Sequence, residues 1–229
     1  MCAIYEPPSL FNLTHFSSLR PTFEYLDEAY PGYWAPALVK MEDAEDELVP
    51  VKSVFGLIPY WSKDGKNYKQ TYNARSETIA EKNSYRGPWK RRQFCLIPAQ
   101  SFFEPRYAGS KSVRWRIHRK DGEPFAIAGI WDRWNSPDGE VRSHSMVTVN
   151  AADHPLMKHF HKPTDEKRSV VVLDRKDYSA WLGAKDDSEA RALLRLFNAD
   201  EYTAEAAPKA KPPAMPPAGG AEPTPSLFD

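Results

Sequence analysis

Short apolar runs separated by turn-forming residues dominate this chain and most constrain its fold. Several of the runs are rich in β-branched and aromatic residues, and Pro, Gly or Asn bounds them, which is typical of strands. In the run 112–118, Val113, Trp115 and Ile117 alternate with polar residues, as expected for a strand with one buried face. The strands predicted in this way are 53–59, 93–99, 101–105, 112–118, 124–131, 143–149 and 169–173.

Helical patterns are fewer and lie between these runs. We expect helices in residues 76–83, 150–161, 174–183 and 188–197, of which the first begins at the N-cap residue Ser76 and the third ends at Gly183. Many strands with a few helices between them predict an α+β fold. We expect a curled, largely antiparallel, barrel-like sheet with a few flanking helices.

The chain divides into one domain and a tail. A body of residues 1–202 is long enough to bury one sizeable core. Pro and Ala make up over half of residues 203–229, so we expect a disordered tail there.

Charge and cysteine content exclude several classes of protein. The 31 basic and 31 acidic residues balance, which argues against a polycation, although a basic face remains possible. There is no apolar run of 18 residues and no secretory signal pattern, so we expect a cytoplasmic protein that does not cross a membrane. The two cysteines, Cys2 and Cys95, are expected to be reduced, and Cys95 to be a small buried apolar residue. No Cys or His spacing is typical of a zinc site, so no metal or cofactor is expected.

Cys2 directly follows Met1, an unusual place for one of only two cysteines. If Met1 is removed, Cys2 carries an α-amine and a thiol on adjacent carbons. Such an aminothiol attacks an aldehyde through nitrogen and then closes a five-membered ring through sulfur. The alternative is a chance cysteine at a frayed chain end.

Residues 71–107 carry most of the other polar candidates. Asn73 and Arg75 offer an amide and a planar guanidinium suited to phosphate, or else are a turn residue and a surface charge. Glu104 ends an apolar strand, where a partly desolvated carboxylate suits acid–base chemistry, or else forms a structural ion pair.

The basic residues of 82–92, including Arg86, are interleaved with Tyr85 and Trp89. This pattern fits single-stranded nucleic acid, or a solvated helix face.

Three histidines lie in "HPLMKHFH": His154, His159 and His161. Their spacing is not a familiar zinc motif, and a single histidine directed at a cleft as a proton shuttle is the better interpretation.

Together these motifs resemble the SOS-response-associated peptidase (SRAP) family, whose members shield abasic sites in single-stranded DNA. The resemblance rests on Met1-Cys2 and on "FGLIPYW", "NARSET", "CLIPAQSFFEP" and "HPLMKHFH", in family order over residues 1 to about 175. It implies a covalent crosslink between DNA and protein, formed when Cys2 closes a thiazolidine with the aldehyde of the ring-opened sugar, which protects the lesion during replication. Removal of Met1, by autoproteolysis or by an aminopeptidase, would come first.

The resemblance also assigns roles to single residues. Asn73 would hydrogen-bond the opened sugar or the new ring, Glu104 would shuttle protons, and His161 would fall at the family's proton-transfer histidine. Arg75 would hold a phosphate beside the lesion, and Phe55 and Trp61 would lie near the family's aromatic wedge.

This chain departs from the family pattern at several points. "MCAI" replaces the usual "MCGR", and "KPTDEKRSV" replaces a shorter segment after His161, so Lys162 or Arg168 is expected to substitute for the missing arginine. These departures leave a non-covalent single-strand-binding module open as an alternative. A cysteine hydrolase that uses Cys2 with His161 is a further alternative.

The tail offers a possible second partner. Ser226, Leu227 and Phe228 fit the apolar end of peptides that dock on the bacterial replication sliding clamp, although the usual glutamine is absent, so an unremarkable tail is the alternative. We expect a monomer that acts at the nucleoid.

Overall fold

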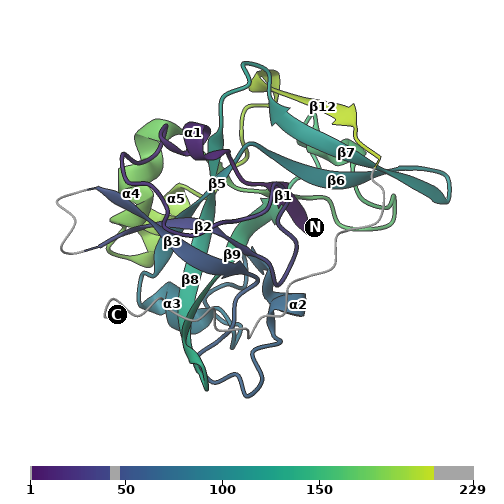
Figure 1. The fold of residues 1–229 in the computed structure, drawn as a ribbon. Helices are drawn as coiled ribbons and strands as arrows, with labels where there is room; N and C mark the ends of the chain where they lie inside the picture. Colours follow the sequence, from purple (N-terminus) through teal and green to yellow (C-terminus); the bar gives the residue numbers. More distant parts are fainter. Residues whose placement is uncertain (1, 42–46, 209–229) are drawn as a thin grey trace.

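A closed β-barrel lies at the centre of the protein (Figure 1). The computed structural model describes residues 2–41 and 47–208. The barrel strands follow the order β9-β3-β2-β5-β8, and β8 pairs back to β9. Strands β3 and β9 run parallel, and the other barrel pairs are antiparallel. The expected curled, largely antiparallel sheet is therefore confirmed. The barrel strands are β2 (Trp34–Lys40), β3 (Leu48–Phe55), β5 (Phe94–Ala99), β8 (Phe125–Ser136) and β9 (Gly139–Asn150).

Three short strands extend the barrel sheet. Strand β4 (Asn73–Arg75) pairs in parallel with β9, while β10 (Arg168–Val170) pairs antiparallel with β9. Strand β11 (Val172–Leu173) pairs with β8. Strand β9 therefore carries the "NARSET" motif on one side and the segment after His161 on another.

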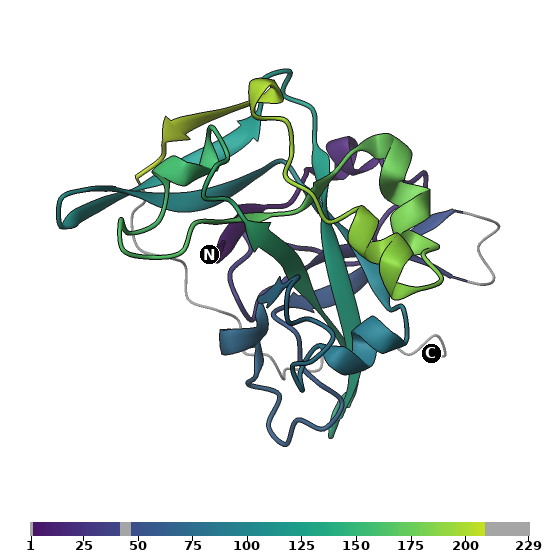
Figure 2. The same cartoon turned by 180° about the vertical axis from the view of Figure 1, so that it is seen from behind.

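A second sheet lies beside one end of the barrel and receives the N-terminal segment (Figures 1 and 2). Its order is β1-β6-β7-β12, and all its pairs are antiparallel. The strands are β1 (Ile4–Glu6), β6 (Ser101–Ala108), β7 (Lys111–Arg119) and β12 (Tyr202–Ala206). Strand β12 runs past the expected boundary at residue 202, so residues 203–206 join the sheet rather than the tail. Residues 209–229, which include Ser226, Leu227 and Phe228, lie outside the described residues.

The helices are short and cover the outside of the sheets. The α-helices are α1 (Leu10–Leu13), α2 (Tyr68–Thr71), α3 (Arg86–Lys90), α4 (Tyr178–Leu182) and α5 (Asp187–Ala192), and 3₁₀ turns are η1 (Met157–His159), η2 (Arg175–Asp177) and η3 (Ala199–Glu201).

Two of the predicted helices are wrong. Residues 76–83 form turns, because the backbone N–H of Ser76 continues the β4 pairing by donating to the Thr148 carbonyl at 2.9 Å. In 150–161 only the turn η1 forms, because the His154 ring accepts the N–H of Met157 at 3.0 Å and closes a tight local turn.

The barrel interior is close-packed and includes a buried histidine. A Cβ added to Gly129 would lie 2.7 Å from the Cys95 sulfur, so the Cys95 side chain has room beside β8 only because this residue is glycine. The His144 ring stacks on Phe55, and its Nδ1 lies 2.9 Å from the Ser53 hydroxyl. Burial lowers the pKa of His144 to about 3, so this ring is neutral at physiological pH.

Candidate functional site

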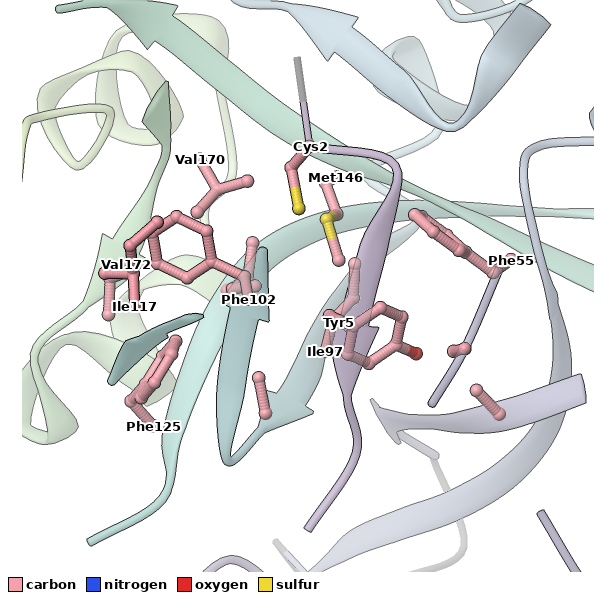
Figure 3. Close-up of a cluster of buried hydrophobic side chains, with 14 of the residues drawn as sticks. Cys2, Tyr5, Phe55, Ile97, Phe102, Ile117, Phe125, Met146, Val170 and Val172 are labelled. Atoms are coloured by element: carbon pink, nitrogen blue, oxygen red, sulfur yellow. The ribbon is translucent and has the colours of Figure 1, made fainter. Parts of the chain in front are cut away.

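Cys2 is held between the two sheets rather than at a frayed end. Strand β1 pairs with β6 so that Ile4 lies opposite Phe103, and the continued register brings Cys2 beside Glu104 and Pro105. Cys2 is 1% exposed, and its thiol donates to the Ile4 carbonyl at 3.3 Å. It belongs to the buried cluster of Figure 3. The N-terminal segment is therefore part of the fold, and the thiol has a fixed position.

The environment of Cys2 keeps its thiol protonated. Burial raises the pKa of the Cys2 thiol well above its usual value, and the negative charge of Glu104 raises it further. Hydrogen bonds from the backbone of Ile4 and Phe103 oppose this rise only in part. A reaction through this sulfur therefore needs a nearby group that accepts its proton.

A hydrogen bond from Asn73 fixes the backbone of Cys2. Strand β4 places Asn73 opposite Met146 of β9, and its Nδ2 donates to the Cys2 carbonyl at 2.6 Å. The Tyr85 hydroxyl donates to the Asn73 carbonyl at 3.0 Å. The Asn73 side-chain oxygen is buried and has no hydrogen-bond partner among residues 2–41 and 47–208. Buried polar atoms without a partner are rare in folded proteins.

Glu104 and His161 form a buried pair next to Cys2. The His161 Nε2 lies 2.9 Å from the Glu104 Oε2, and the two side chains are 4% and 1% exposed. His161 has a left-handed backbone conformation with φ of 64°, and its N–H donates to the Pro105 carbonyl at 2.8 Å. The Lys167 ammonium donates to the carbonyls of Phe160, His161 and Lys162. These bonds hold a strained turn that directs the imidazole at the strand carrying Glu104.

The other two histidines of the motif do not reach this site. His154 is buried, but its Nε2 lies 2.9 Å from the Phe197 carbonyl, and its Nδ1 accepts backbone N–H groups. His159 is exposed on the turn η1. The geometry thus selects His161 from the three histidines.

The structure brings Cys2, Asn73, Glu104 and His161 together from four separate segments. The arrangement offers a thiol, an amide and a carboxylate–imidazole pair able to move a proton. Their catalytic roles remain predictions. Sequence reasoning missed Tyr72, whose pKa is raised by burial and by its neighbours Cys2 and Glu104. Its place directly before Asn73 was the only signal that pointed to it.

Several residues predicted to contact DNA are accessible. Trp61 is 46% exposed, and Arg86 and Lys162 are exposed. Arg75 is about half exposed but forms an ion pair with Glu166 at 2.8 Å. DNA contact by these residues stays a prediction.

Two residues predicted to contact DNA are buried in this structure, so DNA contact by either one stays a prediction. Phe55 is 0% exposed because it ends strand β3 facing the core, where it packs edge-on against Tyr5 and stacks on His144. The Arg168 side chain is 2% exposed, and its guanidinium bonds to Glu77 at 2.8 Å and to Glu166 at 2.6 Å. Neither side chain has a free surface for a DNA strand.

The interleaved segment 82–92 also separates into two faces. Tyr85 and Trp89 are buried in the core, whereas Lys82, Arg86 and Lys90 are exposed. Tyr85 and Trp89 are therefore unavailable for base stacking, and the solvated-face alternative describes this segment better.

The described residues hold neither a helix that could span a membrane nor a cluster of metal ligands. No helix within 2–41 and 47–208 is long and apolar enough to span a membrane. Within the same ranges, no three His, Cys, Asp or Glu side chains gather as metal ligands would.

The relatives found by comparison with known proteins share the name abasic site processing protein. The chain is 34% identical over 153 residues to the abasic site processing protein YoqW of Bacillus subtilis, covering 66% of this chain and 65% of the relative. It is 27% identical over 203 residues to the abasic site processing protein HMCES of Rattus norvegicus, covering 72% of this chain and 53% of the relative. The chain thus spans between about half and two thirds of the length of these relatives.

Solved structures show the same fold. A protein from Bordetella bronchiseptica, 31% identical, superposes with a TM-score of 0.82 over 90% of this chain and 99% of the other. A protein from Bacteroides thetaiotaomicron, 24% identical, has a TM-score of 0.74 over 90% and 91% of the two chains. The family model "SOS response associated peptidase (SRAP)" matches residues 13–210, most of the chain, although the match begins after Cys2. The chain is a member of the SRAP family.

Proposed function

We propose that this protein processes abasic sites in DNA by forming a covalent link through Cys2. The observation that carries the proposal is the fixed, buried position of Cys2 beside Asn73 and the Glu104–His161 pair. The relatives named abasic site processing proteins support the choice of substrate. The ring-opened sugar of an abasic site supplies the aldehyde that an aminothiol needs.

The proposed reaction proceeds in two stages and loses one water. The Cys2 α-amine adds to the aldehyde carbon, and the carbinolamine expels water to give an imine. The sulfur then adds to the same carbon while the thiol proton passes to the nitrogen, which closes a thiazolidine. An α-amine has a reference pKa of about 8, so roughly a tenth of it is neutral and nucleophilic at pH 7.

The surrounding residues supply the proton transfers. The raised pKa of the Cys2 thiol means that ring closure needs a proton acceptor, and the Glu104–His161 pair is adjacent. The same pair donates the proton that turns the departing hydroxyl into water. Asn73 holds the Cys2 carbonyl, which orients the amine and thiol toward the sugar.

The proposal requires that Cys2 be the first residue of the mature protein. As long as Met1 is present, the Cys2 nitrogen belongs to a peptide bond and cannot form an imine. Removal of Met1, by the protein itself or by an aminopeptidase, is therefore the activating step, and self-removal would be the peptidase activity of the protein.

The test is the intact mass of the protein after incubation with a single-stranded oligonucleotide that contains one abasic site. We expect the mass of the protein without Met1 plus the oligonucleotide, less one water. Cys2→Ala should abolish the adduct, whereas Cys95→Ala, which removes the buried barrel thiol, should retain it.

Two results would overturn the proposal. Unmodified protein with Met1 confirmed absent would leave non-covalent strand binding as the better account. Turnover of a peptide or ester that depends on Cys2, without an adduct, would favour a hydrolase.

A further inference from the structure

Arg75 lies at the edge of the candidate site. It is two residues from Asn73 on strand β4, and residues two apart on a strand share a face. Asn73 is buried against Cys2, whereas the Arg75 side chain is 48% exposed. Its guanidinium therefore lies at the solvent-exposed end of strand β4, where a phosphate of a bound strand can approach.

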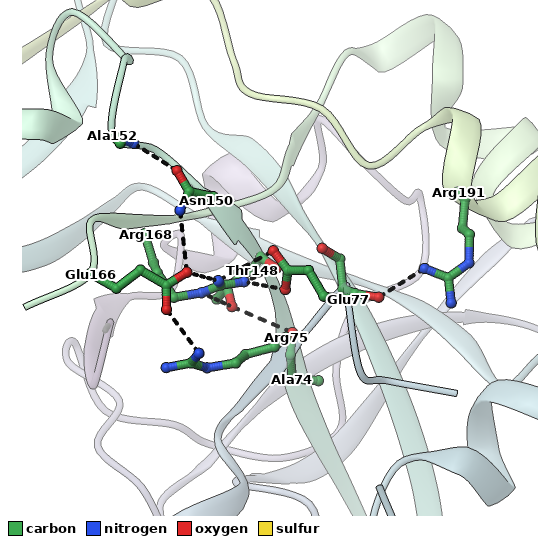
Figure 4. Close-up of polar contacts among 10 residues, drawn as sticks. Ala74, Arg75, Glu77, Thr148, Asn150, Ala152, Glu166, Arg168 and Arg191 are labelled. Atoms are coloured by element: carbon green, nitrogen blue, oxygen red, sulfur yellow. Dashed lines mark hydrogen bonds and ion pairs between the residues drawn. The ribbon is translucent and has the colours of Figure 1, made fainter. Parts of the chain in front are cut away.

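The Glu166 carboxylate of the same chain already forms an ion pair with this guanidinium. The Arg75 Nη1 lies 2.8 Å from the Glu166 Oε2, and the other Glu166 oxygen lies 2.6 Å from the Arg168 Nη1 (Figure 4). The Asn150 amide also donates to Glu166, at 3.3 Å. Glu166 belongs to the segment "KPTDEKRSV", residues 162–170, of which 162–167 connect His161 to strand β10.

Arg168 acts as the anchor of this arrangement. It is buried, and its guanidinium is fixed by Glu77 at 2.8 Å and by the Thr148 carbonyl at 2.8 Å. One oxygen of Glu166 thus pairs with a buried cation, and the other pairs with a cation that is about half exposed. Burial raises the pKa of Glu166, but the hydrogen bond and charge of Arg168, with the charge of Arg75, lower it overall, so Glu166 is ionised at neutral pH.

We infer that Glu166 is an internal competitor for DNA phosphate at Arg75. This inference rests on the proposed function, because it assumes that a DNA strand passes the site at Cys2. A strand phosphate must displace the Glu166 carboxylate before it can pair with Arg75, while Arg168 keeps Glu166 close by.

The competition sets how strongly undamaged strands bind. Phosphate contacts position a strand but carry no information about its bases, and therefore none about a missing base. Weakening such a contact lowers affinity for every strand alike. Discrimination is then left to the covalent step at Cys2, which only an aldehyde can complete.

The test is equilibrium binding of an undamaged single-stranded oligonucleotide, measured by fluorescence anisotropy at several salt concentrations. We expect Glu166→Gln to bind about two- to fivefold more tightly, the range of a partly exposed ion pair. The slope of log K against log salt should steepen by up to about 0.7, because one more phosphate contact forms on a single strand.

Glu77→Gln is the matched control. It removes the same charge from the other side of Arg168 but does not contact Arg75, so we expect a smaller gain in affinity and no change in salt slope. In a Glu166→Gln background, Arg75→Ala should remove the gain. Glu166→Ala is a second variant with the same expectation if Glu166→Gln perturbs folding.

Three results would overturn the inference: unchanged or weaker binding by both Glu166 variants, an equal gain in Glu77→Gln, or a gain that survives Arg75→Ala. Crosslinking of an abasic oligonucleotide, measured on the same variants, separates the two proposals. An adduct without a gain in strand affinity refutes only the competitor role of Glu166. No adduct in any variant, the unmutated protein included, refutes the proposed function.

Discussion

Replacing Glu104 by glutamine tests the proposed proton transfer most directly. Glutamine keeps the length and shape of the side chain but cannot accept a proton. Glu104 is 1% exposed and its Oε2 lies 2.9 Å from the His161 Nε2, so the new amide can still hydrogen-bond the ring. We therefore expect the free energy of unfolding to change by less than about 2 kcal/mol.

The expected kinetic effect is much larger. Removal of a positioned acid–base group usually slows a reaction about 10²- to 10⁴-fold. This corresponds to about 2.7–5.5 kcal/mol in the activation free energy at about 1.36 kcal/mol per decade. The charge effect at Cys2 has the opposite sign: because Glu104 raises the pKa of the thiol, its replacement lowers that pKa and favours the thiolate. A slower reaction would thus reflect lost proton transfer, and not a weaker nucleophile.

The assay is single-turnover crosslinking to an abasic oligonucleotide, followed on denaturing gels. Glu28→Gln is the control, because Glu28 is a carboxylate in an ion pair with Arg114 at 2.7 Å and is not one of the four residues of the candidate site. Alkylation of Cys2 by iodoacetamide in a Cys95→Ala background should shift to lower pH in Glu104→Gln. A crosslinking rate within about tenfold of the unmutated protein would refute the proton-transfer role.

The remaining predictions separate buried from exposed positions. Phe55→Ala should lower the free energy of unfolding by about 3–5 kcal/mol in urea titrations. Trp61→Ala should change the free energy of unfolding by less than about 1 kcal/mol and should weaken single-strand binding. An equal loss of stability in both variants would contradict the assigned burial. Arg168→Ala should cost about 3–5 kcal/mol, because it leaves carboxylates without their buried partner, and a loss below about 1 kcal/mol would refute a structural role. His144 has a pKa of about 3 when folded against about 6.5 when unfolded, so its contribution to stability is full above pH 6.5 and is lost as pH falls toward 3. The slope is up to about 1.4 kcal/mol per pH unit, and His144→Gln should remove it in urea titrations between pH 7 and pH 5; an unchanged slope would show that other groups dominate.

The local pattern of the sequence determined most of the strands. Alternating and β-branched runs are recognisable because the side-chain period of a strand is set by its own backbone. The predicted runs at 93–99, 112–118 and 143–149 accordingly lie in β5, β7 and β9. Strands β1, β2, β4 and β12 escaped prediction. Strands β1 and β4 have only three residues each, and pairing with distant strands defines them.

The ordered motifs also determined which residues to consider in the site. Cys2, Asn73, Glu104 and His161 were chosen by residue type and by their resemblance to a family pattern. No local sequence pattern predicts that these four residues lie close together, because the segments that carry them are far apart along the chain. Their meeting depends on β1 pairing with β6 and on the left-handed turn at His161.

Only the tertiary structure decided which side chains remain available to a ligand. Phe55 and Trp61 belong to one short motif, yet the β3 register buries Phe55 and leaves Trp61 partly exposed. Arg75 and Arg168 are both cations near the site, but Glu77 and Glu166 enclose Arg168 and leave Arg75 at the surface. The physical reason is that burial and ion pairing depend on neighbours from distant segments, whereas strand formation depends mainly on neighbours along the chain.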